Sequence, residues 1–284
     1  MAQAILPLLL LLCASSSSVL SVLLFILLPV VGAVRDRAGS VTCAARLSGV
    51  YTATASYASD HKGFLPTFEY HTYPDGLAQA LPVPEWLEEG GWTILPFSET
   101  TFWAYQLRDH IVDDPVRQHQ LAIESMSCPT LYPDWLAHTE EHEAANEPIN
   151  PMWPMQQSFM KSIALFTEPS AWNDRAVPPD INRVHAAVLM SAVRSPSAKT
   201  FLVERTSFHD HEPIDLISRR PGSRFNLLAV DGHVSIKKPG QAAEPHGFIA
   251  AGTGLESPLV DPDRWREIGI PFLSTHRGAR GHDW

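Results

Sequence analysis

The stretch FNLLAVDGHVSIKK, residues 225–238, places an Asp-Gly pair between two alternating apolar runs. This is a strong hairpin signal, because a two-residue type I′ turn needs positive φ at both central positions. The sequence therefore predicts strands at 225–230 and 233–238, with Val230 facing His233. The residues expected to share one buried face of this hairpin are Phe225, Leu227, Ala229, Val234 and Ile236.

The same turn contains an aspartate and a histidine two residues apart, which is also the composition of an acid–base pair. Aspartate and glycine have a backbone role at such a corner, because both tolerate the left-handed conformation that tight turns require. We therefore interpret Asp231 and Gly232 as a hairpin corner and His233 as the start of the return strand. No catalytic residue is assigned.

Upstream, the segment KTFLVE at residues 199–204 follows a Ser-Pro-Ser turn and predicts a third strand. Further upstream, one set of residues follows the 4-3-4-3 spacing of a buried helix face: Cys43, Leu47, Val50, Thr54 and Tyr57. The run Asp-His-Lys-Gly at 60–63, followed by Pro66, ends this helix. The expected fold class is α+β, with a long N-terminal helix packed on a small antiparallel sheet.

Residues 1–34 contain no charged side chain and no histidine. A membrane-spanning helix needs about 20 predominantly apolar residues, and residues 13–34 supply them. We expect one helix over roughly 19–60, kinked at Pro29. The first choice is a single membrane anchor, and a cleaved secretory signal at residues 4–14 or a buried core helix are alternatives.

The chain has 284 residues, 24 of them proline, and a net charge of −10. Such an acidic chain has no general electrostatic attraction for nucleic acid, and its proline content predicts long irregular loops. We divide it into an anchor and helical stem at 1–62 and a globular domain at 63–284.

Two of the three cysteines, Cys43 and Cys128, are a candidate disulfide pair if the domain faces an oxidising compartment. Two buried free thiols are the alternative. The third, Cys13, follows Leu12 where a lipoprotein signal has a small residue, so lipidation is not expected. No Cys or His spacing predicts a structural zinc site.

A rival enzyme hypothesis rests on the segment His-Thr-Glu-Glu-His at 138–142. His138 and His142 lie one helical turn apart and fit a zinc site, with Glu141 as the base. Glu204 or Glu212 would supply the third ligand. A solvated acidic helix explains the same residues with fewer assumptions.

The segment NLLAVDGHV resembles the C-terminal motif of pseudopilin-like proteins of planctomycete and verrucomicrobial bacteria. It contains Asn226 and the two corner residues, Asp231 and Gly232. That family is described by an H-x9-DG signature and a prepilin-type N-terminus. Three further stretches resemble it in the same order: the helix and its exit at 26–66, Ser-Cys-Pro at 127–129, and the strand at 193–204.

The resemblance implies a pilin-like fold and a non-enzymatic structural subunit of a type II secretion or type IV pilus-like system. It implies a single-pass inner-membrane protein with an extracytoplasmic, periplasmic domain. The expected partners are membrane lipid, through residues 13–34, and further copies or other pseudopilins; no cofactor or metal is implied. In the family's pattern, the processing glycine and glutamate fall at positions 7 and 12, and the signature histidine falls at position 221. This chain has Pro7, Leu12 and Pro221 there, so it is expected to be a divergent member without the prepilin processing site.

Overall fold

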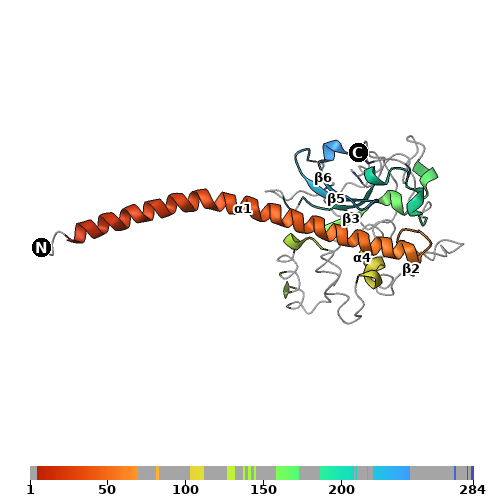
Figure 1. The fold of residues 1–284 in the computed structure, drawn as a ribbon, viewed down its shortest axis with the longest axis horizontal. Coiled ribbons are helices and arrows are strands. Elements are labelled where there is room, and N and C mark those ends of the chain that lie inside the picture. Colours follow the sequence, from red (N-terminus) through yellow and green to blue (C-terminus); the bar gives the residue numbers. More distant parts are fainter. Residues whose placement is uncertain are drawn as a thin grey trace.

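The computed structural model describes residues 5–69, 81–82, 103–111, 127–131, 158–172, 186–207 and 220–243. It also describes a few single residues, among them 137, 140, 141, 144, 209, 216, 272, 280, 283 and 284, and the side chains of the first helix from residue 24 onward. Within these residues the protein is one long helix beside a four-stranded antiparallel sheet, shown in Figure 1. The α+β class is therefore confirmed.

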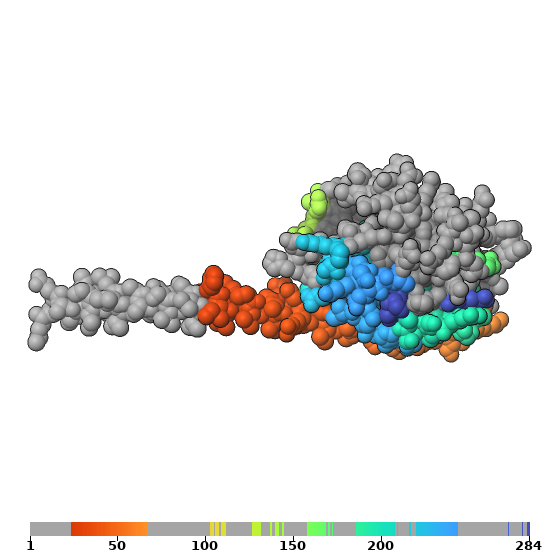
Figure 2. All heavy atoms as spheres, turned by 90° about the horizontal axis from the view of Figure 1, so that it is seen from above, coloured from red at the N-terminus to blue at the C-terminus, as the bar shows by residue number. Residues whose placement is uncertain are grey.

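The helix α1 spans Ile5–Asp60 and is longer at its N-terminal end than the sequence predicted. It contains Pro29, and Figure 1 shows α1 as one continuous, gently curved helix. A proline inside a helix removes one backbone donor, which bends the helix without ending it when the flanking turns are strong. The C-terminal half lies along the sheet, and the N-terminal half extends beyond it (Figures 1 and 2).

The predicted helix face is confirmed. Its five residues are at most 2% exposed: Cys43, Leu47, Val50, Thr54 and Tyr57. They form a core with Leu202 and Leu228 of the sheet and with Trp103. Burial of this stripe holds the stem of α1 on the globular domain.

The helix ends at Asp60, as the sequence predicted. Lys62 and Gly63 have φ of 56° and 86°, and the Gly63 amide donates to the Ala58 carbonyl at 2.6 Å. This left-handed exit satisfies one of the last helical carbonyls. It also turns the chain back, so that the Gly63 carbonyl accepts from the Met190 amide at 2.8 Å.

The sheet has the order β3-β4-β5-β6, and every neighbouring pair is antiparallel. The strands are β3 (Phe159–Lys161), β4 (Thr200–Glu204), β5 (Phe225–Ala229) and β6 (Val234–Lys237). The strand predicted at 199–204 and the hairpin are confirmed, and β3 is an addition. Among the described residues, the short elements are β1 (Phe68–Glu69), β2 (Leu81–Pro82), α4 (Trp103–Leu107) and seven 3₁₀ turns: η2 (Arg108–His110), η3 (Pro129–Leu131), η4 (Ile163–Leu165), η5 (Pro169–Trp172), η6 (Met190–Ala192), η7 (Pro196–Ala198) and η9 (Pro239–Gln241).

The hairpin turn differs from the predicted one. Leu228 pairs with Val234, one register step away from the expected pairing, and the Ala229 amide donates to the His233 carbonyl. Only Gly232 of the corner has positive φ, at 92°. The corner is therefore a three-residue loop ending in a left-handed glycine, which is the next commonest hairpin type, and not a two-residue type I′ turn.

The register correction also changes which side chains are buried. Both faces of β5 are covered: Leu228 and Val230 pack toward α1, whereas Phe225 and Leu227 pack in a second core with Trp172. Ile236, expected in the core, is 54% exposed. A shift of one residue in register moves the side chains of β6 to the other face, so that Val234 and Ile236 lie on the side of Leu228, and Ile236 stays exposed on this edge strand.

No helix in the part of the chain searched, which is limited to the described residues, is long and apolar enough to cross a membrane.

Candidate functional site

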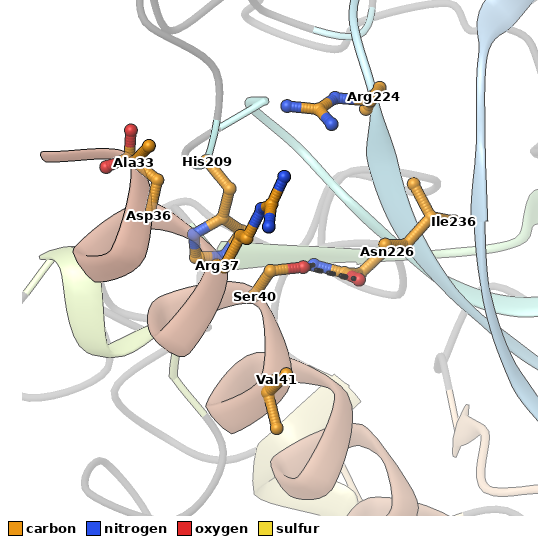
Figure 3. Close-up of a pocket in the computed structure, with 9 residues that line it drawn as sticks. All are labelled: Ala33, Asp36, Arg37, Ser40, Val41, His209, Arg224, Asn226 and Ile236. Carbon is orange, nitrogen blue, oxygen red and sulfur yellow. Dashed lines mark hydrogen bonds between the residues drawn. The ribbon is translucent and has the colours of Figure 1, made fainter. Parts of the chain in front are cut away.

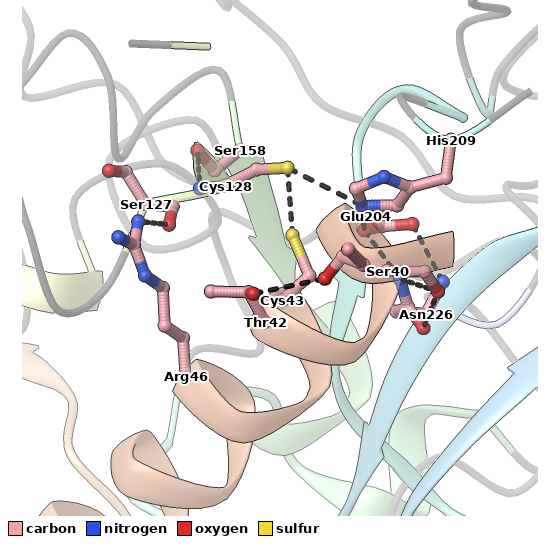
Figure 4. Close-up of polar contacts among 11 residues, drawn as sticks. Ser40, Thr42, Cys43, Arg46, Ser127, Cys128, Ser158, Glu204, His209 and Asn226 are labelled. Atoms are coloured by element: carbon pink, nitrogen blue, oxygen red, sulfur yellow. Dashed lines mark hydrogen bonds and ion pairs between the residues drawn. The ribbon is translucent and has the colours of Figure 1, made fainter. Parts of the chain in front are cut away.

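Four side chains that can ligate metals converge between α1 and the end of β4 (Figure 4). They are Cys43 on α1, Cys128 just before η3, Glu204 at the end of β4, and His209. One ligand atom from each lies within 4.8 Å of all the others. The cysteines and the glutamate are 0% exposed, and the His209 side chain is 9% exposed.

The stem helix positions the two cysteines. Cys43 lies on the buried face of α1, and Arg46 of the same helix donates from its Nη1 to the Ser127 carbonyl. The Cys128 amide donates to the Ser158 hydroxyl at 2.8 Å. These contacts hold the segment around Cys128 against the helix, so that the two Sγ atoms are 2.7 Å apart.

Glu204 is fixed by the neighbouring strand. The Asn226 backbone amide donates to its Oε2 at 2.7 Å, and the Asn226 Nδ2 donates to its Oε1 at 2.8 Å. Asn226 in turn lies 3.4 Å from the Ser40 hydroxyl of α1. A buried carboxylate is costly unless it is hydrogen-bonded, and these two donors hold it in one orientation.

His209 completes the cluster through a single ring nitrogen. Its Nε2 lies 3.6 Å from the Cys128 Sγ and 3.3 Å from the Glu204 Oε1. The ring lies against Gly39 of α1, where a Cβ would be 3.1 Å from two ring atoms. Gly39 therefore leaves the space that the imidazole occupies.

The sulfurs and the imidazole shift one another's ionisation. The hydrogen bond from Cys43 lowers the pKa of Cys128 to about 5 against the effect of burial, and His209 adds to this lowering. That same hydrogen bond and burial raise the pKa of Cys43. Burial alone lowers the pKa of His209, but Cys128 and Glu204 outweigh it and raise the value to about 10.

Glu204 behaves as a buried acid. Burial raises its pKa, and the hydrogen bonds from His209 and Asn226 act in the opposite direction.

The geometry argues against a catalytic relay. In a nucleophile–histidine–acid triad, one ring nitrogen contacts the nucleophile and the other contacts the acid. Here both contacts are made by Nε2 of His209. Groups that converge on one point suit a bound cation or the joining of the two sulfurs better than proton transfer along a line.

A pocket of about 520 Å³ lies beside the cluster (Figure 3). His209 and Asn226 line it on one side, and Asp36, Arg37 and Arg224 contribute charged groups. It gives solvent a route to the His209 side of an otherwise buried site.

The family-motif residues have structural positions. Asp231 accepts from the His233 backbone amide at 3.2 Å and lies 2.7 Å from its ring Nδ1, on an exposed corner. A Cβ on Gly232 would lie 2.5 Å from the Tyr51 ring of α1. The corner is thus where the hairpin contacts the helix, whereas Asn226 is the motif residue that reaches the cluster.

The residues of the rival zinc hypothesis are not brought together among the described residues. His138, His142 and Glu212 lie outside them, and Glu141 is exposed. Glu204, one proposed third ligand, contacts Asn226 and His209 instead.

Sequence reasoning paired Cys43 with Cys128 but missed His209 and gave Glu204 a different role. The structure holds both cysteines as thiols, so the disulfide stays a prediction. The sequence signals for Glu204 and His209 were a glutamate that ends an apolar strand and a His-Asp-His run at 209–211. Neither has a spacing that predicts a shared site.

In comparisons with family models, curated proteins and solved structures, nothing matches this chain.

Proposed function

We propose that this protein is a non-enzymatic, pseudopilin-like structural subunit, anchored in the bacterial inner membrane by the N-terminal half of α1. The observation that carries the proposal is the division of this one helix. Its stem buries the stripe from Cys43 to Tyr57 against the globular domain, whereas residues 24–34 extend from the domain with their apolar side chains exposed.

The exposed segment is strongly apolar. Phe25 is 83% exposed and Leu28 is 68% exposed, and the other large exposed residues of this segment are Leu24, Ile26, Leu27, Val30, Val31 and Val34. A continuous apolar surface of this kind marks a membrane or protein contact. The absence of any charged residue before Arg35 supports lipid as that contact.

The arrangement of helix and sheet supports the pilin-like part of the proposal. A long helix whose second half covers one face of a small antiparallel sheet leaves its first half free to associate with lipid and with other copies. A structural role also fits the hairpin corner, where Gly232 lies against the Tyr51 ring of α1.

The anchor is tested by substituting Leu28→Arg in the full chain and following its fractionation in bacterial cells. Arginine at the centre of a membrane helix costs about 2.5–3.5 kcal/mol on insertion scales. We expect the parent in the membrane fraction, extracted by detergent but not by high salt, and the variant depleted from it. The matched control is Ser48→Arg, at an exposed position of the stem. A parent chain that is soluble after lysis contradicts the anchor.

Association is tested separately, by chemical crosslinking of the Cys13→Ser, Val30→Cys variant in membranes. A structural subunit is expected to give dimers and higher species through the exposed Val30 position. The control Thr52→Cys, exposed on the stem, should give fewer. A protein that stays monomeric in the membrane contradicts the assembly role and leaves the anchor standing.

A further inference from the structure

We propose that the reduced protein binds one Zn²⁺ ion between α1 and the sheet, with Cys43, Cys128, His209 and Glu204 as the ligands. Two sulfurs, one imidazole and one carboxylate form a ligand set that zinc accepts in tetrahedral sites. This site is independent of the anchor, because all four residues lie in the stem and the globular domain.

Two of the distances already match a zinc tetrahedron. Ordinary zinc–ligand lengths place the sulfur and nitrogen ligands about 3.6 Å apart and the nitrogen and oxygen ligands about 3.4 Å apart. The observed separations from the His209 Nε2 are 3.6 Å to the Cys128 Sγ and 3.3 Å to the Glu204 Oε1. The imidazole therefore already lies at zinc-ligand spacing from the Cys128 sulfur and the Glu204 oxygen.

The sulfur–sulfur separation must increase on zinc binding. Two zinc-bound thiolates lie about 3.8 Å apart, and the observed separation is 2.7 Å. A disulfide would need about 2.05 Å, so the pair moves in either case. A disulfide, however, uses only the two cysteines and gives no reason for a buried carboxylate and an imidazole at the same point.

The surroundings of Glu204 are those of a supported metal ligand. Metal-binding carboxylates are held by hydrogen bonds from a second layer of residues. Asn226 donates to both oxygens of Glu204, and is itself in contact with Ser40 of α1. Metal binding would require both cysteines as thiolates, and a divalent cation would largely offset the charge of two thiolates and a carboxylate in this buried position.

The pocket beside His209 provides an entry route for the ion. It is lined by His209, Ser40 and Asn226, and its charged residues are Asp36, Arg37 and Arg224. Figure 3 shows the His209 ring and the Asn226 side chain directed toward the same space as Ser40. A bound ion would join three segments far apart in sequence, namely the stem, the Cys128 segment and β4.

The test uses the detergent-solubilised full chain in a Cys13→Ser background, reduced with a phosphine and titrated with Co²⁺. We expect the visible bands of tetrahedral cobalt and a thiolate-to-cobalt charge-transfer band, both saturating at one ion per chain and both lost on adding Zn²⁺. Zinc should also raise the Tm. Because only sulfur ligands give that charge-transfer band, the parent spectrum is informative even where variants fold poorly.

Variants assign the ligands. Cys43→Ser and Cys128→Ser should each remove part of the charge-transfer intensity, and His209→Gln should keep it while weakening Co²⁺ affinity more than about tenfold. The matched control is His233→Gln, at the exposed hairpin corner, which should bind as the parent does. Two results overturn the proposal: a reduced, folded parent without the band, or undiminished binding in the double cysteine variant, which would mean an adventitious ion only.

Discussion

Gly232 is the residue on which the hairpin corner depends. Its φ is 92°, and a Cβ there would lie 2.5 Å from the Tyr51 ring. We predict that Gly232→Ala destabilises the protein by on the order of 1–3 kcal/mol from the backbone alone. The clash with Tyr51 adds to this cost. Urea unfolding followed by circular dichroism measures the loss.

The control for this substitution is Gly222→Ala. No atom lies within 4 Å of a Cβ at Gly222, and its φ is not in the positive range. Its stability should stay within about 0.5 kcal/mol of the parent. Equal losses for the two alanine variants would mean that the corner does not contact α1 as described.

Asn226 is the residue that links the family-like motif to the cluster. If Glu204 is a zinc ligand, Asn226→Ala removes the Nδ2 donor but keeps the backbone donor. We predict a Co²⁺ affinity about 10–100-fold weaker, with the thiolate charge-transfer band retained at saturation. A band lost altogether would instead point to collapse of the site, and unchanged affinity would exclude Asn226 as a positioning residue.

At the scale of single residues, the sequence predicted burial better than contacts. The 4-3-4-3 spacing placed Cys43 on the buried face, and this is confirmed. It carried no information on which residues would meet Cys43, because His209 and Glu204 reach it through loop and strand geometry. Gly39 makes room for the His209 ring, a role that the helical spacing does not indicate.

At the scale of elements, the stem helix is held by its buried stripe. Leu47 is 0% exposed in the core between α1 and the sheet, whereas Val41 on the same helix is 69% exposed. We predict that Leu47→Ala costs about 2–5 kcal/mol of unfolding free energy. Val41→Ala should cost less than about 0.5 kcal/mol. Similar losses for both in chemical unfolding would contradict the packing of this helix face.

The cysteine pair gives a second prediction at this scale. Reaction of the reduced, metal-free protein with oxidised glutathione should transfer its disulfide to Cys43 and Cys128 and release two reduced glutathiones. The bridge would close a chain of 85 residues and stabilise the fold by about 4–5 kcal/mol in the chain-entropy model. It should also abolish Co²⁺ binding. Peptide mapping and urea unfolding check both effects, and a Cys43→Ser variant that gains the same stability would contradict the pairing.

The hairpin shows why elements were easier to predict than registers. Asp-Gly between apolar runs located β5 and β6 correctly, because few other structures accept that pattern. The same dipeptide is compatible with two loop lengths, and the Tyr51 contact with Gly232 favours the longer one. That contact is tertiary, so local sequence could not decide the register.

At the scale of the whole molecule, a buried ion pair ties the chain near residue 283 to the sheet. Lys199 and Asp283 are both fully buried, with Nζ and Oδ1 3.0 Å apart, and Asp283 Oδ2 also accepts from the Thr200 amide. We predict that Asp283→Ala costs about 3–5 kcal/mol, because it leaves a buried ammonium without its carboxylate. The double variant Lys199→Met, Asp283→Ala should recover part of the loss.

The unfolding free energy lost in the Asp283→Ala variant should depend on pH. Burial lowers the pKa of Lys199, with Asp283 acting against it. Removing Asp283 lowers the pKa of Lys199 further. The loss of stability is therefore full at acidic pH, where Lys199 is charged. It then shrinks as the pH rises toward the ordinary lysine pKa, since the neutral amine is tolerated. Urea unfolding across this range checks the trend, and a deficit independent of pH would contradict it.

The class of fold could be predicted from sequence because one long apolar helix and one hairpin dominate it. The arrangement of the sheet could not, since β3 is three residues long and pairs with β4 across more than 40 residues. The rival histidines at 138 and 142 fall outside the described residues. Function therefore rests on the helix and on the four-residue cluster.

The most direct test of the anchored structural subunit is the mass of the mature protein recovered from bacterial membranes. The proposal predicts a chain with an unprocessed N-terminus, in the membrane fraction and released only by detergent, because Pro7 and Leu12 replace the residues of a prepilin processing site. A soluble chain beginning near residue 14 would contradict it and identify a secreted domain.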